Sequence, residues 1–148
     1  MHLVQLNIAT LVAPEGDPRV APFFENLERI NQLGDESPGF VWRLEGDEGA
    51  GATDIKAWDD PLMILNLTVW ESVDALKTYA YKTEHVELFK RRAEFFEPHD
   101  GPHLAMWWIP EGEVPTVEDA IERLSHLAEH GPTERAFTFA SIMEPAIR

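Results

Sequence analysis

The sequence contains no cysteine, and acidic residues far outnumber basic ones. The absence of thiols excludes disulfides, thiolate nucleophiles, zinc–thiolate sites and iron–sulfur clusters. Lys and Arg number 12 against 27 Asp and Glu, which gives a formal net charge of −15. Nucleic-acid binding needs clustered basic side chains, and anionic membranes repel an acidic protein. We therefore expect neither a nucleic acid nor a membrane as partner.

Long apolar runs and known cofactor motifs are also missing. No apolar segment approaches the roughly 20 residues of a membrane-spanning helix. The first ten residues, MHLVQLNIAT, have no basic stretch of the kind that opens a secretory signal. The chain has no phosphate-binding glycine loop, no dinucleotide fingerprint, and no nucleophile elbow or Ser-His-Asp signature. We expect a cytoplasmic protein that uses no cofactor.

What is present is the composition of a globular protein. Of the 148 residues, 44% are hydrophobic and 26% are charged, both close to globular averages. A chain of this length buries enough surface to fold without disulfides or metals. We expect one domain over residues 1–148, with a core at 1–110 and a C-terminal extension at 111–148.

Hydrophobic periodicity predicts strands alternating with helices. Strands are expected over residues 3–11, 40–44, 62–70, 103–109 and, at the end of the chain, 136–140. Helices are expected to begin after the cap residues Asp17, Ser72, Thr83 and Thr116, and to end near Gly34, Ala80, Phe96 and Gly131. The polar segment 45–61 is long for a connection within a compact domain. This order predicts an α+β fold, a ferredoxin-like antiparallel sheet with helices on one face, followed by a helix–strand extension.

A sheet with helices on one face leaves its other face uncovered. Here that face would expose tryptophans and apolar strand residues, so we expect a second copy of the chain to cover it and form a homodimer.

The residues also resemble a known family. The blocks that carry the resemblance are QLNIA, SPGFVWRL, NLTVWES, HVELFKRR, PHLAMWW and the ending with PT, HGP and FTF. They are similar to an uncharacterised bacterial domain-of-unknown-function family in the dimeric α+β barrel superfamily, beside antibiotic-biosynthesis monooxygenase-like domains. The resemblance implies a homodimer with facing sheets and a cleft between each sheet and its own helices. The superfamily includes monooxygenases, haem-degrading enzymes, isomerases and binding proteins, so the fold does not select an activity.

The predicted helix after Thr83 carries the first candidate site. His85, Phe89, Arg92 and Phe96 share one helical face. His85 there would act as a general acid or base, and Arg92 would hold an anion. Val86, Phe89, Ala93 and Phe96 form an equally good apolar stripe, which would leave His85 at the protein surface.

Polar side chains in two predicted strands suggest a ligand cleft. Gln5 and Asn7 share one face of the first strand, and Asn66, Thr68 and Trp70 share one face of the third. Buried amides must find hydrogen-bond partners, which a ligand or water can supply. A cross-strand amide pair that fixes the register is the alternative.

Five tryptophans are many for this length. Trp107 and Trp108 are adjacent on one predicted strand, so their rings point to opposite faces. Trp42 and Trp107, together with Tyr81, are candidates to line an aromatic cleft, although packing in the core or in an interface explains most tryptophans as well.

Two histidine patterns suggest metals but lack defined geometry. His126 to His130 match the H-x-x-E-H pattern. They stand at a predicted helix end, where the helix dipole favours histidine. His99, Asp100 and His103 span a loop and the start of a strand. We expect no metal site.

Our leading hypothesis is a cofactor-independent enzyme, a monooxygenase, isomerase or cyclase, that acts on a hydrophobic or aromatic small molecule. Its catalytic residues would be His85 and Arg92, and its substrate would contact Asn7, Trp42, Asn66, Tyr81, His103 and Trp107. The alternative is a non-catalytic dimeric protein that binds a small hydrophobic metabolite or haem, with His85 or His103 as a contact.

Overall fold

A four-stranded antiparallel sheet forms the centre of the molecule. The computed structural model describes residues 1–46, 52–53, 55–82 and 90–145. The strands are β1 (His2–Thr10), β2 (Phe40–Arg43), β3 (Met63–Trp70) and β4 (Leu104–Ile109), in the spatial order β2-β3-β1-β4. All neighbouring strands are antiparallel. The predicted ferredoxin-like sheet is therefore confirmed, with strand bounds within one residue of those expected.

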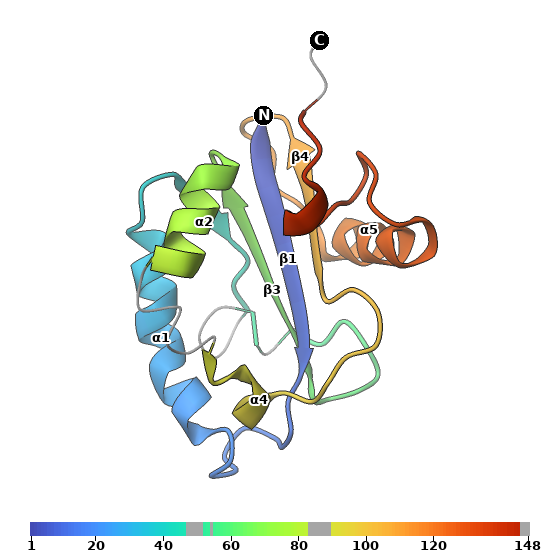
Figure 1. Ribbon diagram of the computed structural model, residues 1–148. Helices are drawn as coiled ribbons and strands as arrows, with labels where there is room; N and C mark the ends of the chain where they lie inside the picture. The colour runs from blue at the N-terminus through green and yellow to red at the C-terminus, as the bar shows by residue number, and fades with distance from the viewer. Residues whose placement is uncertain (47–51, 54, 83–89, 146–148) are drawn as a thin grey trace.

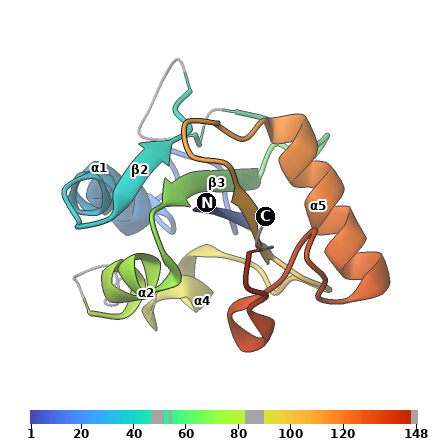
Figure 2. The ribbon, with the colours of Figure 1, turned by 90° about the horizontal axis from the view of Figure 1, so that it is seen from above.

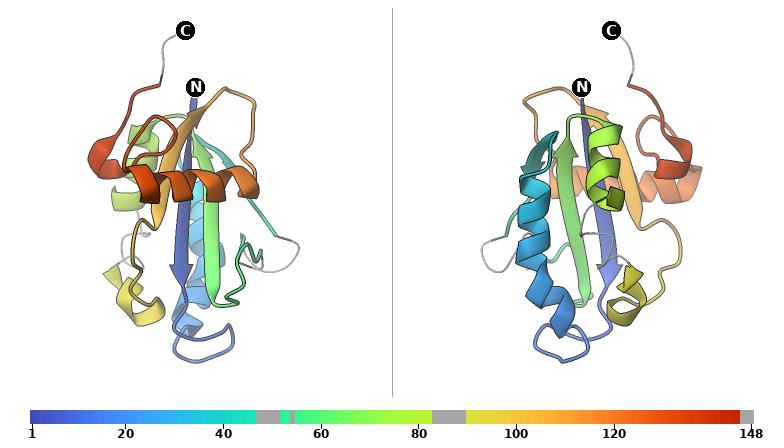
Figure 3. Two further views of the ribbon diagram at one scale, coloured as in Figure 1. Left: turned by 90° about the vertical axis from the view of Figure 1, so that its right-hand side faces the viewer. Right: turned by 60° about the vertical axis from the view of Figure 1, so that its left-hand side comes forward.

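Three helices lie on one face of the sheet, as Figure 1 and the right-hand view of Figure 3 show. They are α1 (Ala21–Asp35), α2 (Val73–Lys82) and the short α4 (Arg92–Phe95). Leu3, Trp70 and Met106 from the strands pack here against Ile30 and Leu76 from the helices. This face also holds the polar residues of the central strands.

Side chains that cap a helix fix where it begins. Of the three predicted caps within the described residues, Asp17, Ser72 and Thr116, two are confirmed. Ser72 Oγ accepts a hydrogen bond from the Ala75 amide at the start of α2. Thr116 Oγ1 accepts a hydrogen bond from the Asp119 amide at the start of α5 (Val117–His130). The prediction for α1 is wrong: this helix begins at Ala21, and Asp17 instead accepts hydrogen bonds from Arg19.

Helix α5 (Val117–His130) crosses the opposite face of the sheet, as the left-hand view of Figure 3 shows. Seen from above in Figure 2, α5 lies on the other side of the sheet from α1 and α2. Its apolar stripe, Ala120, Leu124 and Leu127, packs on strand residues that include Val4 and Trp107. The helix ends at Gly131, whose φ of 75° is a conformation that glycine adopts readily.

The expectation that this second face is open is therefore wrong. Val4, Leu67, Val69 and Trp107 are all fully buried within a single chain. The amphipathic pattern of residues 117–127 identified a helix but not the face it covers. The homodimer stays a prediction, and α5 already covers the surface assigned to it.

Residues 131–145, the last described part of the chain, form no regular strand. The strand expected over residues 136–140 is replaced by isolated bridges, one joining Phe137 to Met106 of β4, and by a 3₁₀ turn over Phe139–Ser141. Trp108 Nε1 donates a hydrogen bond to the Met143 carbonyl 2.7 Å away. This contact and the Phe137 bridge hold the tail beside β4.

Within the described part of the chain, none of the helices is both long and apolar enough to span a membrane.

Candidate functional site

A cavity of about 510 Å³ lies between the sheet and the helices of the first face. Its wall is largely apolar, and Ile30, Leu76 and Phe96 belong to it. On the sheet side it is lined by three amide side chains from the two central strands, Gln5, Asn7 and Asn66. An apolar cavity with a few placed polar groups is the usual form of a small-molecule site.

A chain of hydrogen bonds leads from the protein core to Gln5. Trp70 Nε1 donates to Thr68 Oγ1 at 2.9 Å, and Thr68 Oγ1 donates to Gln5 Oε1 at 3.2 Å. Gln5 and Thr68 face each other in the register of β1 and β3. The Gln5 side chain is buried but still lines the cavity.

A buried arginine holds Asn66. Arg43 Nη1 donates to Asn66 Oδ1 at 3.0 Å, and Arg43 Nε donates to Asp35 Oδ1 at 3.1 Å. The Arg43 side chain is 4% exposed, whereas that of Asp35 is 43% exposed. Arg43 Nη2 is buried without a hydrogen-bond partner among the described residues. The site therefore contains a cation whose carboxylate partner is half in solvent.

Tyr79 and Gly34 pack around the arginine. The Tyr79 hydroxyl donates to the Ile30 carbonyl at 3.2 Å, and its ring stacks on Trp70 at 5.2 Å between centroids. Burial raises the pKa of the Tyr79 phenol, and the nearby Arg43 charge opposes that rise. A Cβ at Gly34 would lie 2.8 Å from Arg43 Nη2 and 3.2 Å from the Tyr79 ring. A side chain at this position would require Arg43 Nη2 and the Tyr79 ring to shift.

Five of the residues proposed from the sequence line this one cavity. Asn7 and Asn66 lie on its sheet side, and His103, Tyr81 and Arg92 also line it. The Tyr81 side chain is half exposed, and the carbonyl of His103 accepts a hydrogen bond from the Ile8 amide at 2.9 Å. His85, the proposed acid or base, lies outside the described residues.

Trp42 and Trp107 do not line the cavity. Both pack in the core cluster on the other face of the sheet. Trp107 is fully buried beneath the Arg123 guanidinium, which is 5.2 Å from its ring centroid. Strand alternation correctly placed Trp107 and Trp108 on opposite faces, but alternation alone does not tell which face is lined by the cavity.

Sequence reasoning placed Gln5 on the face of the candidate cleft but did not include it among the substrate contacts, and it did not identify Arg43 or Tyr79 as site residues. Gln5 carried a usable signal, because it shares a strand face with Asn7. Nothing in the sequence marked Arg43 as a site residue, because an arginine in a short strand is usually exposed. Tyr79 lies in a helical stripe that is typical of ordinary core packing.

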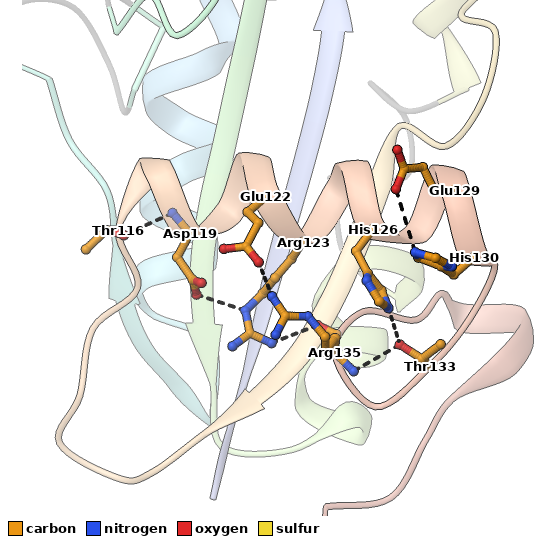
Figure 4. A network of polar contacts seen from close by, with 9 residues as sticks. All are labelled: Thr116, Asp119, Glu122, Arg123, His126, Glu129, His130, Thr133 and Arg135. Carbon is orange, nitrogen blue, oxygen red and sulfur yellow. Dashed lines mark hydrogen bonds and ion pairs between the residues drawn. The ribbon is translucent and has the colours of Figure 1, made fainter.

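The H-x-x-E-H pattern holds no metal-binding geometry. His126 Nε2 lies 3.1 Å from Thr133 Oγ1, and His130 Nε2 lies 3.6 Å from Glu129 Oε2. Figure 4 draws both contacts as dashed lines. Beside them Arg123 links Asp119 to the Arg135 carbonyl, which ties α5 to the tail. The described residues contain no group of three side chains that could hold a metal ion, whether here or around His99, Asp100 and His103.

A second hollow, of about 660 Å³, lies along the outer side of α1. Four acidic residues line it: Glu15, Glu28, Asp35 and Glu45. It lacks the apolar wall of the first cavity, and we do not assign it to the site.

Comparison with solved structures identifies proteins that share this fold. A conserved protein from Methanosarcina mazei Go1 is 12% identical, with a TM-score of 0.52 over 74% of this chain and 94% of its own. A protein of unknown function from Nitrosomonas europaea is 10% identical, with a TM-score of 0.50 over 78% and 95%. A monooxygenase from Streptomyces coelicolor, solved in complex with Nanaomycin D, is 15% identical, with a TM-score of 0.45 over 77% and 92%. At these identities the likeness concerns the fold.

Comparison at the level of sequence gives a family but no activity. The model of a domain of unknown function, DUF3291, matches residues 2–148. A comparison with curated proteins found no match.

Proposed function

The chain belongs to the DUF3291 family, a domain of unknown function, and from that premise we propose that it binds a hydrophobic, cyclic small molecule in the cavity beneath α1 and α2. We further propose that it converts this molecule without a cofactor, as a monooxygenase, an isomerase or a cyclase. The observation that carries the proposal is the cavity itself. It has a volume of about 510 Å³ and a largely apolar wall, with amide side chains on one side. Its size lies within the roughly 300–1,000 Å³ of small-molecule sites.

The chemistry we propose is proton transfer at a carbon next to a carbonyl group. A general acid or base contributes roughly 10²–10⁴-fold to such a step. His85 is our candidate for this role and stays a prediction; His103, which lines the cavity, is the candidate within the described residues. Arg92 and Arg43 both line the cavity and would favour the anion that forms.

The binding part of the proposal is tested with 2-ethylnaphthalene, a bicyclic hydrocarbon. We expect saturable binding to the wild-type protein by isothermal titration calorimetry. Ala9→Phe places a ring in the cavity, which Ala9 lines, and should abolish binding. Ala128→Phe, the same substitution at an exposed position on α5, should not. Equal binding by all three proteins, or no binding by any, would refute the proposed site.

The catalytic part is tested with any small molecule that is found bound to the protein after purification. The ligand is extracted, identified by mass spectrometry and returned to the protein in air. A product that has gained one oxygen atom and lost two hydrogen atoms would identify a monooxygenase, because without a cofactor the substrate itself must reduce the second oxygen atom of O₂ to water. A rearranged product of equal mass would identify an isomerase or cyclase. Recovery of the ligand unchanged would reject catalysis and leave a binding protein.

We also propose that the protein is cytoplasmic and forms a homodimer. Any such dimer would have to use a surface other than the sheet face beneath α5.

A further inference from the structure

Two hydrogen bonds determine which way the amide side chains of Gln5 and Asn66 are turned. An indole N–H can only donate, so Trp70 makes Thr68 Oγ1 an acceptor and leaves the hydroxyl hydrogen for another group. Thr68 Oγ1 donates that hydrogen to Gln5 Oε1, which lies 3.2 Å away. The Gln5 NH₂ group is then the end left over.

A hydrogen bond from Arg43 orients the Asn66 amide in a similar way. A guanidinium can only donate, so Arg43 requires the oxygen of Asn66, Oδ1, to face it. The Asn66 NH₂ group is again the end left over. Neither NH₂ group has a hydrogen-bond partner within the described part of the chain, and both residues line the cavity.

The strand register places the two NH₂ groups on one patch of the sheet. Gln5 pairs with Thr68, and Asn66 lies two residues away on the same face of β3. Such diagonal neighbours are about 7–8 Å apart. This separation is between the residues, and both amide groups stand on side chains. One oxygen can accept an N–H···O bond of about 3 Å from each NH₂ group when the two nitrogens lie within about 6 Å of each other.

Resting on the proposed function, we infer that the ligand carries an oxygen acceptor, a ketone, enolate or carboxylate, which is held by Gln5 Nε2 and Asn66 Nδ2. Trp70 and Arg43 are positioning residues, because they fix the amides with their donors toward the cavity. Arg43 adds a positive charge behind Asn66, and its partner Asp35 is 43% exposed and therefore partly screened by water. The two NH₂ donors therefore favour a ligand oxygen that gains negative charge, as a carbonyl oxygen does when the neighbouring carbon loses a proton.

The test compares two probes with the same carbon skeleton, 2-acetylnaphthalene and 2-ethylnaphthalene, by titration calorimetry. Only the first has an oxygen acceptor. We expect the ketone to bind the wild-type protein roughly tenfold more tightly than the hydrocarbon. Asn66→Asp retains an oxygen for Arg43 but puts a second oxygen where the NH₂ group was. It should remove the tenfold preference and leave hydrocarbon binding unchanged.

Two further variants complete the test. Gln5→Met deletes the other donor at similar volume and should also lower ketone affinity selectively. Asn31→Asp adds the same charge as Asn66→Asp to the α1 side of the cavity and should retain the preference. Hydrocarbon binding in each variant shows that the cavity is still folded.

The outcomes separate this inference from the proposed function. Equal affinity of the two probes for the wild-type protein would overturn the donor pair and leave the cavity standing as a hydrophobic site. Failure of both probes to bind would overturn the proposed function itself. A preference for the ketone that survives both Asn66→Asp and Gln5→Met would place the acceptor elsewhere.

Discussion

Tyr79 is a buried acid in the wall of the cavity, and its titration can be measured. Burial raises the pKa of its phenol, only partly offset by the Arg43 charge. In the unfolded chain the phenol titrates near its ordinary value, about 10. Because the folded pKa is higher, the stability that Tyr79 contributes is fully present below pH 10 and is lost as the pH rises through the folded pKa.

Tyrosinate absorbance of the wild-type protein and of Tyr79→Phe measures this shift. The absorbance that disappears in the variant should titrate above pH 10, the ordinary value for tyrosine. Titration of that component at or below pH 10 would mean that Tyr79 is not buried.

Gly34 is constrained by what it touches. In a helix, replacing glycine by alanine is ordinarily stabilising by about 1 kcal/mol. Here the added methyl would meet Arg43 Nη2 and the Tyr79 ring, and overpacking of this kind costs about 1–3 kcal/mol. We therefore expect Gly34→Ala to lower the free energy of unfolding in urea. Gln32→Ala, at an exposed position of the same helix, should leave it nearly unchanged, and a stabilised Gly34→Ala would contradict the contact.

At this scale the sequence predicted one part of the site and missed another. Period-two alternation placed Asn7 and Asn66 on strand faces, and the register brings them opposite each other. Arg43 could not be found in this way. It is buried where Asp35 and Asn66, which lie 8 and 23 residues away in the sequence, meet it in the folded chain.

Among the elements, α5 contributes to stability by closing the second face of the sheet. Leu124 points into that cluster and is 9% exposed. Leu124→Ala removes buried methyl groups and leaves a cavity, which costs about 2–5 kcal/mol. We expect this loss in urea unfolding, with Ser125→Ala as the exposed control on the same helix. A loss no greater than that of the control would mean that α5 is not packed on the sheet.

The sequence predicted the elements better than their places. Strand bounds and the caps at Ser72 and Thr116 follow from local periodicity and local hydrogen bonds. The side of the sheet on which α5 packs does not follow from local patterns, because an apolar stripe can pack on any apolar surface. The expected tail strand failed for a related reason. Residues 136–140 have strand-like residue types, but only Phe137 bonds to β4.

For the whole molecule, the account requires that α5 of the same chain, and not a partner, buries Trp107. Its fluorescence, taken as wild type minus Trp107→Phe, should keep the short-wavelength emission of a buried indole throughout a dilution series. Dimer formation through another surface would not change this result. A shift to longer wavelength on dilution would show that a second subunit covers the face.

The central claim is that the two amide donors of the cavity hold a ligand oxygen. Nuclear magnetic resonance of the side-chain NH₂ groups in ¹⁵N-labelled protein tests it most directly, with Gln5→Met and Asn66→Asp to assign the signals. The account predicts that 2-acetylnaphthalene moves both NH₂ signals downfield, as a new hydrogen bond does, and that 2-ethylnaphthalene does not. Equal shifts with the two probes, or no shift with the ketone at saturation, would contradict it.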